Sequence, residues 1–136
     1  MHGVQREWFM VYWNTLASRC YGAAGTLARE RYERCAISRA YYAAYSRITH
    51  ALVLRGVTFT VRGVKRGNPS HAALPALVEN HLQVLGQHRW VVADYLRTLY
   101  GYRVAADYFP SYQVNAAIAG KAVDIMKKVF DLTKSL

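Results

Sequence analysis

Apolar residues recur at helical spacing along much of the chain, most clearly between Glu33 and Arg55. One stripe repeats there every three or four residues, as a core-facing helix requires: Ile37, Tyr41, Ala44, Ile48 and Leu52. Four residues lie roughly on the opposite side: Arg39, Tyr42, Ser46 and His50. Because small alanines stand among the tyrosines and few acids solvate the second side, we expect this helix at the centre of a bundle or at a subunit seam.

The same spacing predicts four further helices and no convincing sheet. The expected ranges are Gln5 to Ala24, His71 to Leu85, Gln87 to Ala106 and Tyr112 to Lys134. Residues 57–70 are expected to form a loop, because the alternating apolar residues at 57–61 form one short strand without a partner. The economical architecture is one domain over residues 1–136, an all-α, up-and-down antiparallel bundle of about five helices.

Glycine, proline and polar residues predict where these helices begin and end. Gly22 and Gly25 are expected to loosen the end of the first helix, and Gly56 to end the second. Asn68 or Ser70 is expected to cap the third helix. Pro110 should stop the fourth, and Ser111 should cap the fifth.

Charge and composition narrow the class of protein. The chain has 18 Lys and Arg against 8 Asp and Glu, a net charge of +10, which favours an acidic partner such as nucleic acid or an acidic protein. A hydrophobic content of 53% excludes intrinsic disorder, and no run of apolar residues is long enough to cross a membrane. Cys20 and Cys35 are expected as two buried thiols in a reducing cytoplasm, and the first residues do not resemble an export signal.

The predicted fourth helix carries the arrangement that points most directly to chemistry. Arg103 falls on its apolar stripe and should therefore face the core or a cleft, where a guanidinium needs a partner. Asp107, four residues later, can supply one, although an acid in the last turn opposes the helix dipole. Two interpretations stay open: an inward ion pair that fixes the corner, or a phosphate site in which Asp107 orients Arg103.

Three segments resemble the HEPN domain, particularly its small stand-alone members. They are SRAYYAAY at 38–45, Ser70-His71 at the start of the third helix, and YRVAADY at 102–108. The resemblance spans nearly the whole chain in the same order. It implies a helical bundle, usually a homodimer, often encoded beside a minimal nucleotidyltransferase in toxin–antitoxin or defence modules. Active members of the family are metal-independent endoribonucleases with the signature Arg, four to six residues, then His, near the end of the fourth helix.

This chain departs from that signature. Counting from Arg103, the histidine would fall where the sequence has Tyr108, Phe109 and Pro110. In the implied mechanism the histidine takes a proton from a ribose 2′-hydroxyl, and loss of a general base costs a factor of about 100 to 10,000. An acid paired with arginine is a weak base, and unperturbed phenols titrate near pH 10, so neither Asp107 nor Tyr108 replaces it well. In some modules of the family, the partner nucleotidyltransferase adenylylates a tyrosine near the motif, for which Tyr108 is the candidate.

Other basic and aromatic residues complete the candidate set. Arg39 and the loop residues Arg62, Lys65 and Arg66 are expected either to contact phosphate or to be solvated surface. The tyrosines of the second helix serve either packing or nucleotide stacking. No metal site is expected, and no cofactor motif is present. The leading hypothesis is an RNA- or nucleotide-binding HEPN-like homodimer. Its rivals are an active ribonuclease with a substitute base, perhaps His50, and a non-catalytic scaffold for an acidic protein.

Overall fold

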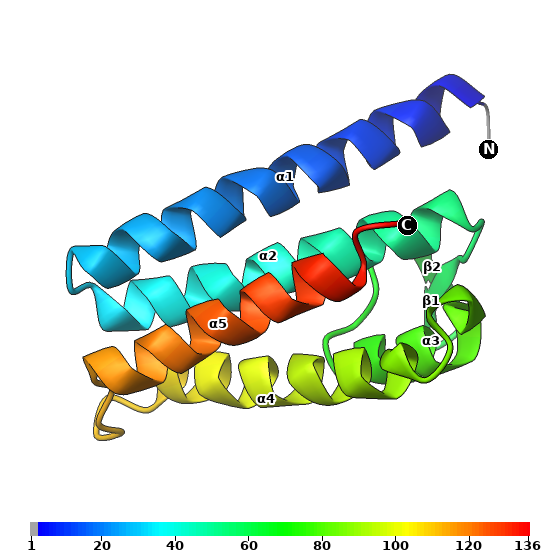
Figure 1. The fold of residues 1–136 in the computed structure, drawn as a ribbon. Coiled ribbons are helices and arrows are strands. Elements are labelled where there is room, and N and C mark those ends of the chain that lie inside the picture. The colour runs from blue at the N-terminus through cyan, green and yellow to red at the C-terminus, as the bar shows by residue number, and fades with distance from the viewer. Residues whose placement is uncertain (1–2) are drawn as a thin grey trace.

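The chain folds as an up-and-down bundle of helices. A computed structural model describes the backbone of residues 3–136 and the side chains of residues 12–136. Its elements are α1 (Gly3–Arg29), α2 (Glu33–Leu54), β1 (Phe59–Val61), β2 (Val64–Arg66), α3 (Leu74–His81), a 3₁₀ turn (Gln83–Leu85), α4 (His88–Tyr108) and α5 (Ala116–Leu132). The four long helices α1, α2, α4 and α5 run alongside one another in alternating directions (Figure 1). The predicted all-α bundle of five helices is therefore confirmed.

Helix α2 lies at the centre of the bundle and packs against α1, α4 and α5. All five residues of its predicted inner stripe are buried. Ala36, Ala40, Ala43 and Ala51 are also fully buried, on other sides of the same helix. Small side chains let neighbouring backbones approach closely, so α2 can be enclosed by three helices at once.

Helices α1 and α2 end with the same local motif. At the end of α2, Val57 N donates to Leu52 O at 3.1 Å and Gly56 has φ of 75°, so Gly56 ends the helix as predicted. At the end of α1, Tyr32 N donates to Leu27 O at 2.9 Å, but the left-handed position is filled by Arg31. The prediction that glycines loosen α1 near residue 24 was wrong, because the helix runs through both glycines to Arg29.

The expected loop at 57–70 contains a two-stranded hairpin, so the prediction of no sheet was wrong. Strand β1 pairs antiparallel with β2, with Phe59 opposite Arg66 and Val61 opposite Val64. Phe59 is buried and anchors the hairpin to the bundle, while all of β2 is exposed. The first strand does have a partner, which lies on the far side of a two-residue turn.

The third and fifth helices are shorter than predicted. Ser70 Oγ accepts a hydrogen bond from Ala73 N at 3.1 Å, but this closes a turn that precedes α3, which begins at Leu74. Helix α5 begins at Ala116, where Asn115 Oδ1 accepts from Ile118 N at 2.9 Å, so the predicted cap at Ser111 was wrong.

The two thiols have different environments. Cys20 is buried as expected, but Cys35 is exposed, so the prediction of two buried thiols was half wrong. Among residues 3–136, no helix is long and apolar enough to cross a membrane.

Arg34 ties the end of α4 to the start of α2. Its guanidinium donates to the carbonyl oxygens of Ala106 at 2.8 Å, Phe109 at 3.3 Å, Pro110 at 3.1 Å and Tyr112. The last carbonyls of a helix lack partners within it, so one cation here satisfies both the helix end and the following loop. This contact fixes the part of α4 that carries Asp107.

We expect Arg34→Met to lower the free energy of unfolding by about 2 kcal/mol, because hydrogen bonds to a charged group contribute about 1.5–3 kcal/mol. Urea unfolding followed by circular dichroism measures the change. Arg19→Met, at an exposed position of α1, is the matched control and should stay within about 0.5 kcal/mol of the parent chain. Equal losses for the two variants would contradict the role given to Arg34.

Candidate functional site

Arg103 of α4 is held by one side chain of α2 and one of its own helix. Its Nη2 donates to the hydroxyl oxygen of Tyr42 at 2.8 Å, and its Nε lies 2.9 Å from Oδ2 of Asp107 in an ion pair. The side chain is only 11% exposed. The guanidinium therefore points inward, as its place on the apolar stripe of the helix predicts.

Two aromatic rings enclose the same guanidinium. The carbon Cζ of Arg103 lies 5.3 Å from the ring centroid of Tyr42 and 5.4 Å from that of Tyr108. A cation over an aromatic face is stabilised by about 0.5–2 kcal/mol, more when water is excluded. The ring of Tyr108 is itself 63% exposed, so one wall of this enclosure faces solvent.

The position of Asp107 in the last turn of α4 is explained by its contacts. Besides Arg103, the carboxylate accepts a hydrogen bond from Ser38 Oγ of α2 at 3.5 Å. Burial alone would lower the pKa of Arg103, but Tyr42, Tyr108 and Asp107 together raise the pKa above its usual value. The guanidinium therefore remains charged beside the carboxylate.

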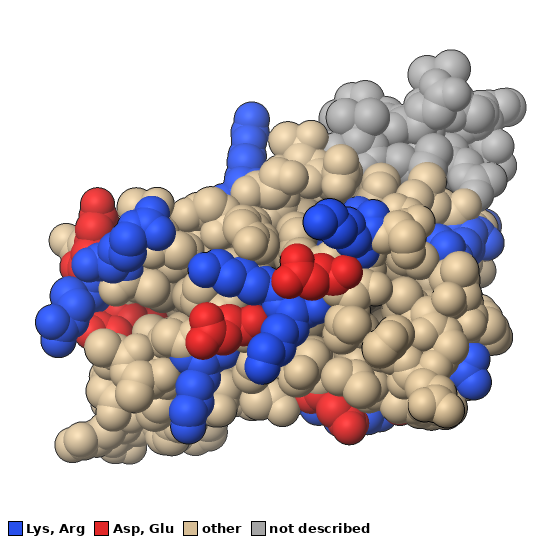
Figure 2. All heavy atoms as spheres, in the orientation of Figure 1, with Lys and Arg blue, Asp and Glu red and all other residues tan. Residues whose placement is uncertain are grey.

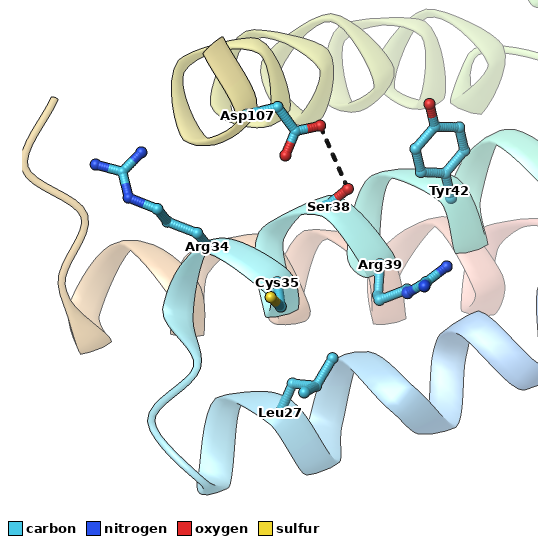
Figure 3. A pocket seen from close by; sticks show the side chains of 7 residues that line it. All are labelled: Leu27, Arg34, Cys35, Ser38, Arg39, Tyr42 and Asp107. Atoms are coloured by element: carbon cyan, nitrogen blue, oxygen red, sulfur yellow. Dashed lines mark hydrogen bonds between the residues drawn. The ribbon is translucent and has the colours of Figure 1, made fainter. Parts of the chain in front are cut away.

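An open groove lies next to this ion pair. It has a volume of about 540 Å³ and is lined by Leu27 of α1, Asp107 of α4 and five residues of α2 (Figure 3). Ser38 faces Asp107 across the groove, and the dashed line in Figure 3 marks the bond between them. Arg39 is exposed, so the groove combines a fixed guanidinium behind its wall with a solvated one at its edge.

A cluster of tyrosines and one histidine continues from Tyr42 into the bundle. The hydroxyl of Tyr41 lies 2.7 Å from Nδ1 of His71, and the His71 ring stacks on Tyr100 with centroids 5.7 Å apart. Tyr45 lies against the same imidazole, with ring centroids 4.9 Å apart. We refer to Tyr41, Tyr42, Tyr45, His71 and Tyr100 as the tyrosine–histidine cluster.

The protonation state of this cluster follows from its burial. Burial raises the pKa of Tyr41, so this phenol keeps its proton. Burial, and secondarily the positive charge of Arg103, lower the pKa of His71, so the imidazole is neutral at pH 7. A buried phenol needs an acceptor, and among the described residues its hydrogen-bond partner is Nδ1 of His71. On this basis we assign the proton of the neutral imidazole to Nε2.

The structure separates the remaining sequence-predicted residues from Arg103. Ser46 is fully buried, and its Oγ has no hydrogen-bond partner among the described residues. His50 follows Tyr42 by eight positions, about 12 Å along the helix, and does not line the groove. Arg62, Lys65 and Arg66 lie on the hairpin, past the far end of α2 (Figure 1). Only Arg39, Tyr42, Arg103, Asp107 and Tyr108 come together.

Sequence reasoning did not connect His71 with Arg103. Tyr41 and His71 are 30 residues apart in the chain, so helical periodicity cannot bring them together. The available signal was the pair Ser70-His71, which belongs to the motifs that carry the resemblance to the HEPN domain. Within the described part of the chain, no group of three or more His, Cys, Asp or Glu side chains is placed to hold a metal ion.

Comparison with known proteins assigns no family to this chain. No family model, curated protein or solved structure matches the chain. The resemblance to the HEPN domain therefore rests on the three sequence segments alone and stays a prediction.

The lowered pKa of His71 predicts a pH-dependent stability. The unfolded chain binds a proton near pH 6.5 that the folded chain binds only at lower pH. The stabilisation is complete above about pH 6.5 and is lost as the pH falls from there toward the folded pKa. We expect the free energy of unfolding to fall over this interval in urea titrations at stepped pH.

His71→Asn should lose this part of the pH dependence, because the amide oxygen still accepts from Tyr41 but does not titrate. His88→Asn, at an exposed position at the start of α4, should retain it. An NMR titration that places the pKa of His71 at or above 6.5 would overturn the argument.

Proposed function

We propose that the groove between α1, α2 and α4 binds the phosphate backbone of RNA, and that the chain is the RNA- or nucleotide-binding component of a toxin–antitoxin or defence-type module. One observation carries the proposal: the charged Arg103 is fixed by Tyr42 and Asp107 directly behind the wall of a groove that presents Arg39 and the hydroxyl of Ser38. A guanidinium held before the ligand arrives loses little side-chain entropy on binding.

The charges around the groove favour an anionic ligand. Arg34 and Arg39 line the groove and Arg103 lies behind its wall, against one carboxylate, that of Asp107. Arg34 already donates to backbone carbonyls, so Arg39 is the solvated cation of the lining. Asp107 is already paired, so it opposes a phosphate less than a free acid would. By contrast, the face in Figure 2 has acidic side chains among the basic ones near its centre. The net charge of +10 adds a general attraction for nucleic acid.

Binding is favoured over cleavage by the state of the nearest histidine. This chain lacks the histidine of the family signature. The substitute base suggested from sequence, His50, does not line the groove. His71 lies nearer, with its ring centroid 6.0 Å from that of Tyr42. In the assigned tautomer, Nε2 carries the proton, so this atom is a hydrogen-bond donor and not a general base.

An active endoribonuclease is the second candidate, and one observation favours it: His71 belongs to the same cluster as the tyrosine that binds Arg103. If Nδ1–H donated to Tyr41, the lone pair of Nε2 would be available to accept the proton of a 2′-hydroxyl. A scaffold that meets an acidic protein is the third candidate, supported by the net charge alone.

The partners in this proposal come from the resemblance to the HEPN domain. They are a second copy of the chain and a nucleotidyltransferase. The exposed phenol of Tyr108 is the proposed acceptor of a nucleotidyl group, because it is the outer wall of the Arg103 enclosure and open to solvent.

Salt-dependent RNA binding tests the groove. We expect Arg39→Gln to weaken binding about five- to eightfold at about 0.1 M salt, and to reduce the slope of log affinity against log salt by about 0.7–0.9. Fluorescence anisotropy with a labelled RNA measures both quantities. Lys121→Gln removes an exposed charge from α5, which does not line the groove, and is the matched control.

The same RNA, incubated in chelator and separated on a denaturing gel, distinguishes the candidates. Cleavage that His71→Asn abolishes would support the ribonuclease and overturn the binding proposal. Binding without cleavage supports the proposal. No binding and no cleavage would leave the scaffold.

A further inference from the structure

The turn of the hairpin places an arginine in an unfavourable backbone conformation. Arg62 and Gly63 connect β1 to β2, with φ of 52° and 76°. Positive φ at both central residues is the pattern of a type I′ turn, in which Asn-Gly is the preferred sequence. Apart from Arg31, Arg62 is the one described residue other than glycine with positive φ. The chain therefore keeps a cation where asparagine would fit the backbone better.

Basic residues dominate the hairpin without any acid to offset them. Arg62, Lys65 and Arg66 are all exposed, and Arg55 precedes the first strand. The sequence has no Asp or Glu between Glu33 and Glu79. Directly opposite residues of an antiparallel pair share a face, so Lys65 lies beside Thr60 and Arg66 beside Phe59. The cations thus project from the turn and from both faces.

The base of the hairpin is held firmly, although its tip is free. Phe59 is 5% exposed and belongs to the core. Just after β2, Asn68 Nδ2 donates to the hydroxyl oxygen of Tyr45 at 3.0 Å, and this hydroxyl donates to Pro69 O at 2.6 Å. A substitution at residues 62–65 therefore leaves the core contacts in place.

We propose that this hairpin is a second, separate contact for the phosphate backbone of RNA, with Arg62 and Lys65 as its principal cations. The inference rests on the proposed function for the nature of the ligand, but not on the groove. Phosphate is the occupant that the residues favour, because three exposed cations meet it without an apolar pocket, and Val64 is the one exposed large apolar side chain of the hairpin.

Arg62→Asn separates the backbone conformation of the turn from the positive charge of its side chain. Asparagine tolerates positive φ better than arginine, so we expect the thermal unfolding midpoint to stay level or rise. RNA affinity should nevertheless fall about five- to eightfold at about 0.1 M salt, with a salt slope smaller by about 0.7–0.9. Arg62→Lys retains the charge and should bind within about twofold of the parent chain, because phosphate contacts depend mainly on charge. Lys65→Gln should weaken binding by the same factor as Arg62→Asn. In the double variant, the two factors should multiply.

Anisotropy with one labelled RNA of mixed sequence, and with polyglutamate as a competing acidic peptide, distinguishes the outcomes. Weaker binding of the hairpin variants supports the inference whatever Arg39→Gln does. If Arg39→Gln weakens binding and the hairpin variants do not, the inference is overturned and the groove proposal stands. A parent chain that binds polyglutamate but no RNA overturns both.

Discussion

The enclosure of α2 by α1, α4 and α5 is the constraint on which the rest of the structure depends. A helix can be packed on three sides only if small side chains form much of its surface, and alanines 36, 40, 43, 44 and 51 supply that surface. Within the span of α2 that faces the groove, Arg34, Ser38, Arg39 and Tyr42 are the polar side chains left to meet solvent or α4. The site is therefore a consequence of how the core is packed.

Tyrosine is the residue that joins the core to the site. Its ring packs like an apolar side chain, while its hydroxyl reaches a polar partner at the edge of the core. Tyr41 binds His71, Tyr42 binds Arg103, and Tyr45 binds Pro69 and Asn68. Three tyrosines within little more than one turn of α2 thus hold α4 and the segment after the hairpin. The tyrosines of α2 therefore combine two roles, because their rings pack in the core and their hydroxyls bind polar groups at its edge.

The sequence predicted what local periodicity determines and missed what depends on distant contacts. The bounds of α2 and its end at Gly56 followed from helical spacing and from the glycine that a left-handed position prefers. The end of α1 and the hairpin turn were missed for a common reason, because Arg31 and Arg62 occupy positions where glycine or asparagine is expected. The inward direction of Arg103 could be predicted from its stripe, but its contact with Tyr42 and the nearness of His71 could not. Both contacts cross between elements far apart in the chain.

Arg31 and Arg62, the two arginines with positive φ, differ in the contacts that their neighbours provide. Arg31 completes the motif that ends α1 and pairs with Glu33 at 3.4 Å, so local contacts offset part of its conformational cost. The turn that holds Arg62 has no acid within the hairpin to pair with it. In the proposed RNA contact, a phosphate supplies the counter-charge that the hairpin itself lacks.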